Sequence, residues 1–354
     1  MCAPDRPPTR RPLPAQRGMS IIEIMGGMVV ALLVGIAATG GAAMFTASQR
    51  QGIGTGGALL NAGNALAAIR DDASAAGLGF FGDSKFLCQQ MNLGVGAAAV
   101  LDGVSFTPVG VTAEAAGDRL DVIYATQVAS GANVLLGAST VGATADLRSY
   151  LPVSVGQVIL LAPDTPGVPC LVRGVTAVTA STADTPQVLT FGNTNTYNQA
   201  AFATTATYPD RGRITLLGEV RWSRYRLEGT DLRLERPMGG APVVLARSVL
   251  AFRVQYGTAA AGTTALDTWQ DASGGWATLT PALMPRVRAL RIGLVTRSTQ
   301  AEKRNAAGNC EATAAMPSLF GTAVTADVTD WQCYRYRTVI SVVPLRNLVM
   351  GMTP

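Results

Sequence analysis

RGMSIIEIMGGMVVALLVGIAATGGAAMF, from Arg17 to Phe45, is the segment around which this chain of 354 residues is organised. From Ile24 onward the segment carries no charged side chain. A helix over those residues is about 33 Å long, which matches the hydrocarbon core of a lipid bilayer. We therefore expect a transmembrane helix over residues 19–45.

A short basic leader precedes this helix. Residues 1–18 contain four arginines and a single acid, Asp5, and their prolines are incompatible with a helix. In a secretory signal the apolar core precedes the cleavage site, whereas here the candidate site at Gly18 precedes the apolar run. The apolar segment is therefore expected to remain after residues 1–18 are removed.

Glu23 is an acid at the edge of the apolar run. An ionised carboxylate at membrane depth costs on the order of 3 kcal/mol unless a partner neutralises it. Cleavage after Gly18 would leave a positive amino group on Met19, four residues before Glu23. That amino group is a suitable partner, either in the same chain or in a neighbouring subunit.

The run from Arg17 to Glu23, RGMSIIE, resembles the processing site of type IV prepilins and of type II secretion pseudopilins. In that family a membrane-embedded aspartyl peptidase cuts after the glycine and methylates the new amino terminus. The resemblance implies cleavage after Gly18, N-methylation of Met19 and a role for Glu23 in assembly through the terminus of the next subunit. The alternative is an ordinary signal anchor with a chance glutamate.

The composition argues against an enzyme. Histidine is absent, which removes Ser-His and Cys-His nucleophile pairs, histidine metal ligands and a histidine general base. The glycines at 52–57 lack the Lys-Ser/Thr ending of a phosphate-binding loop. The leader holds four of the 28 basic and one of the 23 acidic side chains, so the mature chain has a net charge of about +2. We expect no catalytic residue, cofactor or metal, and no large nucleic-acid surface.

Four cysteines remain once Cys2 leaves with the leader: Cys88, Cys170, Cys310 and Cys333. The basic leader places the segment after the helix outside the cytoplasm, where disulfides are expected. Four cysteines allow three pairings. We favour Cys310 with Cys333, which closes a polar loop before the last predicted strand, and Cys88 with Cys170 by elimination.

The helix is expected to continue beyond the membrane over residues 46–78. An apolar stripe at helical spacing would pack on a head domain. Gly40, Gly41 and the four glycines within residues 52–57 each lower helix stability by roughly 0.8 to 1 kcal/mol relative to alanine. A glycine-rich break in the helix is therefore expected there. The stripe consists of Leu59, Ala62, Leu66, Ile69 and Ala73.

Residues 79–354 are predicted to form a β-rich head, which gives an α+β, pilin-like fold with the long helix packed on a mainly antiparallel sheet. The clearest hairpin spans 219–236, with the turn Glu228-Gly229-Thr230-Asp231. The predicted strands are 120–126, 157–162, 171–179, 187–191, 214–217, 219–227, 232–236, 249–256, 287–296 and 335–345.

Patches along the head resemble PilW-type minor pilins. They are the helix end at 67–79, with its Arg-Asp pair and Ala-Gly turn, and residues 118–124, 249–257, 287–298 and 334–347, the last ending in Leu-Arg-Asn. The resemblance implies a low-abundance subunit that helps initiate pilus assembly or sits at the pilus tip. It would be a single-pass protein of the bacterial inner membrane with a periplasmic head, later incorporated into the pilus.

The partners that this resemblance implies are prepilin peptidase, other minor pilins, the major pilin, the inner-membrane assembly machinery and inner-membrane lipid. A type II secretion minor pseudopilin shares the N-terminal chemistry but usually has a smaller head. A pilus-tip adhesin or DNA-uptake receptor is the other alternative.

Two groups of head residues bear on that last alternative. Arginines 221, 224, 226, 233 and 236, near Trp222 and Tyr225, could hold phosphates and stack bases, although such a pattern is more often the solvated face of a hairpin. Asp267 and Asp271 lack the full pattern of a calcium loop, so no metal site is predicted there.

Overall fold

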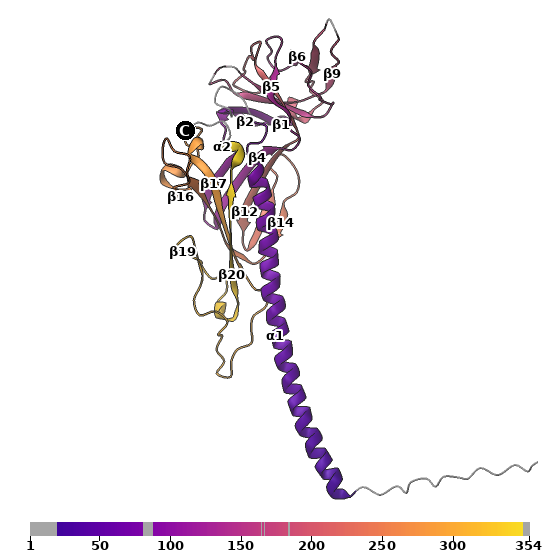
Figure 1. Cartoon of the computed structure of the whole chain (residues 1–354), viewed down its shortest axis with the longest axis vertical. Coiled ribbons are helices and arrows are strands. Elements are labelled where there is room, and N and C mark those ends of the chain that lie inside the picture. Colours follow the sequence, from indigo (N-terminus) through magenta and orange to yellow (C-terminus); the bar gives the residue numbers. More distant parts are fainter. Residues whose placement is uncertain (1–19, 81–87, 164, 166, 183–184, 350–354) are drawn as a thin grey trace, which may run out of the picture. The chain divides into compact units, whose positions relative to one another are not determined.

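The computed structural model describes residues 20–80, 88–163, 165, 167–182 and 185–349. The chain divides into two units, residues 1–53 and 54–354. The first contains most of the long helix α1 (Ile21–Ala75), and the second contains its last turns and the head (Figure 1).

Helix α1 is uninterrupted from Ile21 to Ala75, so the predicted glycine-rich break is wrong. Glycine lowers helix propensity, but unlike proline it keeps the N–H group that continues the backbone hydrogen-bond ladder. The boundary between the two units nevertheless falls inside the glycine-rich stretch, between Ile53 and Gly54.

The head is built from β-sheets, as predicted. Among the described strands every paired neighbour is antiparallel except β1 with β8. A six-stranded sheet has the order β2-β1-β8-β7-β11-β5, and a three-stranded sheet has the order β6-β10-β9. Their strands are β1 Gln90–Val95, β2 Ala98–Ser105, β5 Ala129–Leu135, β6 Thr144–Leu147, β7 Val158–Ala162, β8 Cys170–Gly174, β9 Ala177–Thr179, β10 Gln187–Thr190 and β11 Arg213–Gly218.

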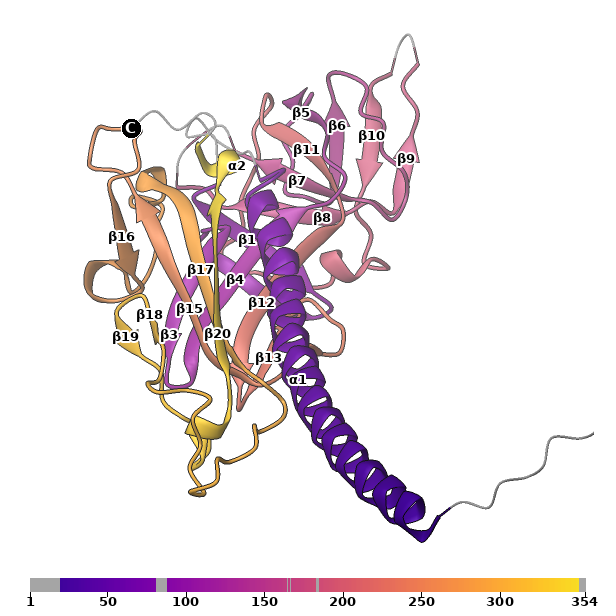
Figure 2. The ribbon, with the colours of Figure 1, turned by 60° about the horizontal axis from the view of Figure 1, so that its bottom comes forward.

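Two further sheets lie beside the last turns of α1 (Figure 2). One has the order β14-β13-β12-β4-β3 and the other β16-β15-β17-β20, while β18 and β19 form a small ribbon. Their strands are β3 Val109–Glu114, β4 Gly117–Ala125, β12 Val220–Glu228, β13 Asp231–Glu235, β14 Val243–Ala246, β15 Val249–Thr258, β16 Thr268–Asp271, β17 Val287–Arg297, β18 Ser318–Leu319, β19 Thr322–Ala323 and β20 Tyr336–Pro344. Short helices complete the fold: η1 Thr196–Asn198, η2 Gly274–Trp276, η3 Met284–Arg286, η4 Trp331–Cys333 and α2 Arg346–Val349.

The predicted hairpin is confirmed. Strands β12 and β13 pair from Arg224 with Glu235 to Glu228 with Asp231, and Gly229 in the turn has a positive φ of 60°. The predicted strand 171–179 is instead two strands in different sheets. The chain turns at Thr176, whose N–H donates to the carbonyl of Thr190 and so directs β9 towards β10.

The main core joins the last turns of α1 to the two sheets beside it and to strands β1, β7 and β8 of the six-stranded sheet. A second core lies between β5, β6, β7, β8, β10 and β11. Four residues of the predicted helix stripe are buried in the head: Ala62, Leu66, Ile69 and Ala73. Leu59 is 47% exposed, so its placement in the stripe is wrong, and Ala58 is buried one position earlier. The stripe therefore follows the helical period but begins at a different residue.

Candidate functional site at the two ends of the helix

The N-terminal end of α1 is closed by a reciprocal pair of hydrogen bonds. The N–H of Ser20 donates to Oε2 of Glu23 over 3.2 Å, and the N–H of Ile22 donates to Oγ of Ser20 over 3.4 Å. This is the arrangement of a capping box, in which both side chains satisfy donors that the first turn leaves free. Within one chain, Glu23 therefore accepts a bond from its own helix start.

The surface that follows Glu23 is apolar on all sides. The described residues contain one helix segment long and apolar enough to cross a membrane, Ile21–Ala42, with a mean hydropathy of 2.4. No residue in the most apolar part of this segment is buried, and large side chains such as Met28 and Leu32 are more than 60% exposed. Such a surface is typical of a helix surrounded by lipid or by other apolar helices. The predicted cleavage and methylation residues, Gly18 and Met19, and the leader 1–18 lie outside the described residues.

The C-terminal end of α1 is fixed to the head by Asp72. Its Oδ1 accepts a hydrogen bond from the hydroxyl of Tyr124 on β4, and its Oδ2 accepts one from Tyr225 on β12, each over 2.6 Å. Both tyrosines are buried, and Tyr225 is 1% exposed. Burial, together with the nearby Asp72 carboxylate, raises the pKa of both phenols, so both remain neutral donors. The sequence resemblance marks this end of the helix, but the role of Asp72 follows only from the structure.

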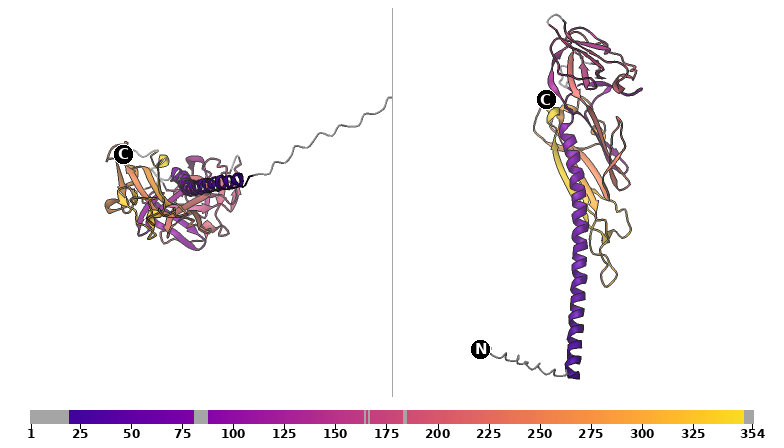
Figure 3. Two further views of the ribbon diagram at one scale, coloured as in Figure 1. Left: turned by 90° about the horizontal axis from the view of Figure 1, so that it is seen from below. Right: turned by 90° about the vertical axis from the view of Figure 1, so that its right-hand side faces the viewer.

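The turn after α1 is held by Asn347, close to the end of the described residues. Nδ2 of Asn347 donates to the carbonyls of Ser74 and Ala76, over 3.4 and 3.3 Å. These carbonyls belong to the end of the helix, where carbonyl groups lack helical partners. In the Leu-Arg-Asn ending of the predicted terminal strand, Asn347 therefore caps the end of the helix. Figure 3 shows α1 ending beside the strands of the head.

Glycine is required in this turn. Gly79 has a φ of 86°, and a Cβ atom built there would lie 2.8 Å from Leu217 and from Val128. A side chain is thus opposed both by backbone conformation and by space. This explains the glycine-containing end of the segment 67–79.

Four of the five arginines of the β12–β13 hairpin form ion pairs with acids of the head, and the fifth bonds a serine. Arg224 bonds Asp121 over 2.7 Å and lies over the ring of Trp222, while the guanidinium of Arg236 donates to Oγ of Ser223. Arg226, Arg233 and Arg221 are paired with Glu235, Glu228 and Glu219 respectively. This arrangement favours the solvated-face interpretation over a phosphate-binding surface.

The favoured disulfide pairing is confirmed. Cys88 is bonded to Cys170 and Cys310 to Cys333, with Cα–Cα distances of 6.0 and 4.6 Å. The first bond joins the segment after α1 to β8 inside the core, and the second closes the loop before β20.

Removing a disulfide is expected to destabilise the head. Because a bond that closes a longer loop removes more entropy from the unfolded chain, the pair Cys88→Ser and Cys170→Ser should cost about 2 to 4 kcal/mol, more than Cys310→Ser with Cys333→Ser. The sequence separations are 82 and 23 residues. Urea unfolding of the full chain in detergent measures both, and a larger loss from the shorter loop would contradict the expectation.

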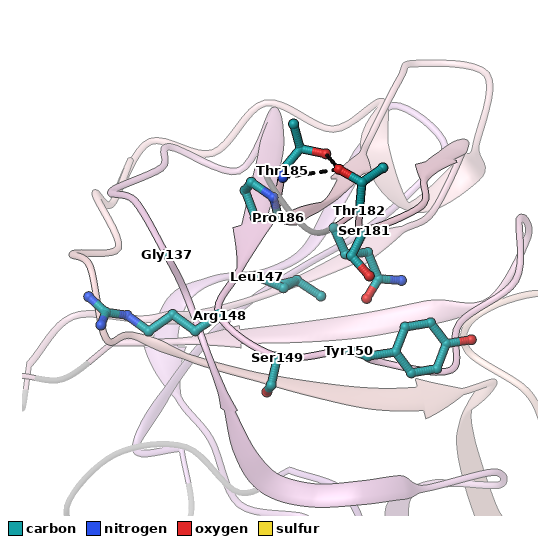
Figure 4. Close-up of a pocket in the computed structure, with 10 residues that line it drawn as sticks. Gly137, Leu147, Arg148, Ser149, Tyr150, Ser181, Thr182, Thr185 and Pro186 are labelled. Atoms are coloured by element: carbon teal, nitrogen blue, oxygen red, sulfur yellow. Dashed lines mark hydrogen bonds between the residues drawn. The ribbon is translucent and has the colours of Figure 1, made fainter.

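An open hollow of about 690 Å³ lies between residues 147–150, at and after the end of β6, and the segment that leads into β10 (Figure 4). Its rim carries the hydroxyls of Ser149, Ser181, Thr182 and Thr185 and the ring of Tyr150. Thr182 and Thr185 bond each other through their hydroxyls over 2.7 Å. The described residues of the lining include no carboxylate and no nucleophile paired with a base, and they offer hydroxyl groups for hydrogen bonding.

The described residues contain no group of three or more His, Cys, Asp or Glu side chains arranged to hold a metal ion. Asp271, which the sequence analysis considered as a calcium ligand, accepts a hydrogen bond from Nε2 of Gln255 over 2.7 Å. Its carboxylate is thus used within the sheet that contains β15 and β16.

Residues 225–347 match the model of the type IV pilus-assembly protein W family, PilW. The match covers about a third of the chain, and over these residues the chain is similar to the PilW family. The match includes β12 from Tyr225 onward and extends to Asn347, so it contains one of the two Asp72 donors and the cap on the helix end. This confirms the family suggested by the sequence, which is a family of pilus proteins.

No curated protein matches the chain. A type IV-like pilin from Thermus thermophilus is similar over 81% of this chain and 96% of its own, with 12% sequence identity and a TM-score of 0.34.

Proposed function

We propose that this PilW-family protein is a minor type IV pilin that helps initiate pilus assembly or sits at the pilus tip. The observation that carries the proposal is the family match over residues 225–347 on a chain whose N-terminal helix is apolar on all sides. A helix with such a surface associates with lipid before assembly and with other apolar helices afterwards. Function then depends on packing, and the protein performs no chemical reaction.

The proposed sequence of events begins in the inner membrane. Prepilin peptidase cuts after Gly18 and methylates Met19, and the assembly machinery then passes the helix from lipid into the bundle of pilin helices. Small residues such as Gly27 and Ala31 allow close approach between helices. The periplasmic head contacts other minor pilins and the major pilin.

The test is the mass of the N-terminal peptide of the protein extracted from membranes. We expect a chain that begins with N-methylated Met19, and its presence in pili sheared from the cell surface. An intact Met1 terminus, or cleavage after Ala42 or Ala43, would refute the proposal and leave an anchored protein of another class.

A further inference from the structure

Strand β20 is an open edge of its sheet. It pairs with β17 over its whole length, from Tyr336 with Arg297 to Pro344 with Ala289, without a bulge. Within the described part of the chain it has no strand on its other side (Figure 2). One row of its backbone N–H and C=O groups is therefore not used by the sheet.

Between Arg337 and Pro344 this edge has no charge, proline or bulge of the kind that normally protects an open strand. The six residues from Thr338 to Val343 are uncharged, and all but Ser341 are β-branched aliphatic residues or threonine. Ile340 and Val342 are 52% and 51% exposed. Natural edge strands are usually short, charged, bulged or covered, because an open edge pairs with other chains. The other edge strands of the two sheets beside α1 are shorter than the nine residues of β20, with four residues in β16 and β14 and six in β3.

The apolar surface is confined to β20. On the neighbouring strand, Gly293 lies directly under Leu319, where an added Cβ would be only 2.6 Å from Cδ1 of that leucine. The guanidinium of Arg291 lies 4.4 Å from the ring centre of Phe320 and 4.8 Å from that of Trp269. On the sheet face that carries Ile340 and Val342, side chains of other segments therefore cover β17, whereas β20 is exposed to solvent.

The charged residues around β20 indicate the kind of partner that would complement this edge. From Trp331 to Val349 the chain contains three arginines and no acid. Arg335 is paired with Glu302. Arg337 and Arg346 are exposed, and no carboxylate of the described residues lies within ion-pair distance of either. The complementary occupant has acidic residues on each side of an apolar strand.

A second copy of this chain does not fit that requirement. If two β20 strands paired antiparallel about Ser341, Arg337 of one copy would lie beside Arg346 of the other. Arg337 would then be opposite Leu345 and one position from Arg346, so like charges would come close together at both ends of the pair and oppose it. We propose that β20 adds a strand from a different pilus subunit, an apolar segment flanked by carboxylates. The backbone bonds would provide affinity, and the two arginines would select the partner. This inference rests on the proposed function.

The experiment places a photo-reactive residue, p-benzoyl-L-phenylalanine, at position 340 of the full chain in cells that assemble pili. Position 243 is the matched control, because Val243 lies on the edge strand β14 and is 53% exposed. We expect an adduct from position 340, and not from 243, that maps by mass spectrometry to an acid-flanked strand of another pilus subunit. An adduct only with a second copy of this chain, or none with a pilus subunit, would overturn the inference.

A second arm uses charge on the edge. Ile340→Lys should lower the amount of this chain in sheared pili at least fivefold, whereas Val243→Lys should change it less than twofold. Thermal unfolding of both purified full-length variants shows whether the head is intact, and equal losses from two intact variants would refute the inference. N-terminal processing is measured in the same samples. An unprocessed Met1 terminus contradicts the pilin proposal itself, while normal processing without the adduct contradicts only the strand addition.

Discussion

Replacing Asp72 with alanine is expected to lower the free energy of unfolding of the head by about 3 to 6 kcal/mol. The variant removes two hydrogen bonds to a charged acceptor, each typically worth about 1.5 to 3 kcal/mol. It also leaves the hydroxyls of Tyr124 and Tyr225 without their acceptor in a buried position. Urea unfolding of the full chain in detergent, followed by tryptophan fluorescence, measures the change.

Asp71→Ala is the matched control, because Asp71 is the adjacent acid on the same helix. Its side chain is 74% exposed and its ion pair with Arg70 is 3.5 Å long. Exposed ion pairs contribute about 0 to 1 kcal/mol, so this variant should change stability little. Tyr225→Phe removes one of the two bonds and should fall between the two aspartate variants. Similar losses from Asp71→Ala and Asp72→Ala would show that Asp72 is not the link between helix and head.

The sequence predicted the apolar span and the disulfide pairing, because the first depends on local pattern and the second on a very small number of alternatives. The role of Asp72 could not be predicted in the same way. Its two donors lie 52 and 153 residues further along the chain, and they come together only when β4 and β12 pair beneath the helix. A second acid, Asp71, stands beside it with nothing in the sequence to distinguish them.

The prediction of strands was limited in the same way, because it relied on local sequence pattern. Those with clear apolar alternation, such as β12 and β13, were predicted, whereas the following were not: β1, β2, β3, β5, β6, β14, β16, β18 and β19. β2 has a largely exposed or half-buried surface, so its sequence AAVLDGVS carries little apolar periodicity. In the opposite direction, glycine propensity predicted a break in α1 that the structure does not contain. A propensity of about 1 kcal/mol per residue is a weak constraint when neighbouring turns are helical.

Glu23→Gln is expected to reduce incorporation of this chain into pili at least tenfold. In a bundle of pilin helices the carboxylate of Glu23 would face the positive terminus of the next subunit, and an unpaired charge at that depth costs on the order of 3 kcal/mol, equivalent to about a hundredfold in occupancy. The measurement is quantitative immunoblotting of sheared pili against membrane-held protein. Processing at Met19 is checked by mass, because the peptidase must still have cut the variant for the result to concern assembly.

Ser20→Ala separates this electrostatic role from the capping role. In the structure Glu23 accepts the N–H of Ser20 and the Ser20 hydroxyl accepts the N–H of Ile22. Glutamine can replace glutamate in a capping box but carries no charge, whereas Ser20→Ala removes half of the box and keeps the charge. If charge pairing between subunits controls assembly, Glu23→Gln removes the protein from pili and Ser20→Ala changes its level less than twofold. If Glu23 acts only as a cap, the order reverses, since the serine variant is then the more damaging one.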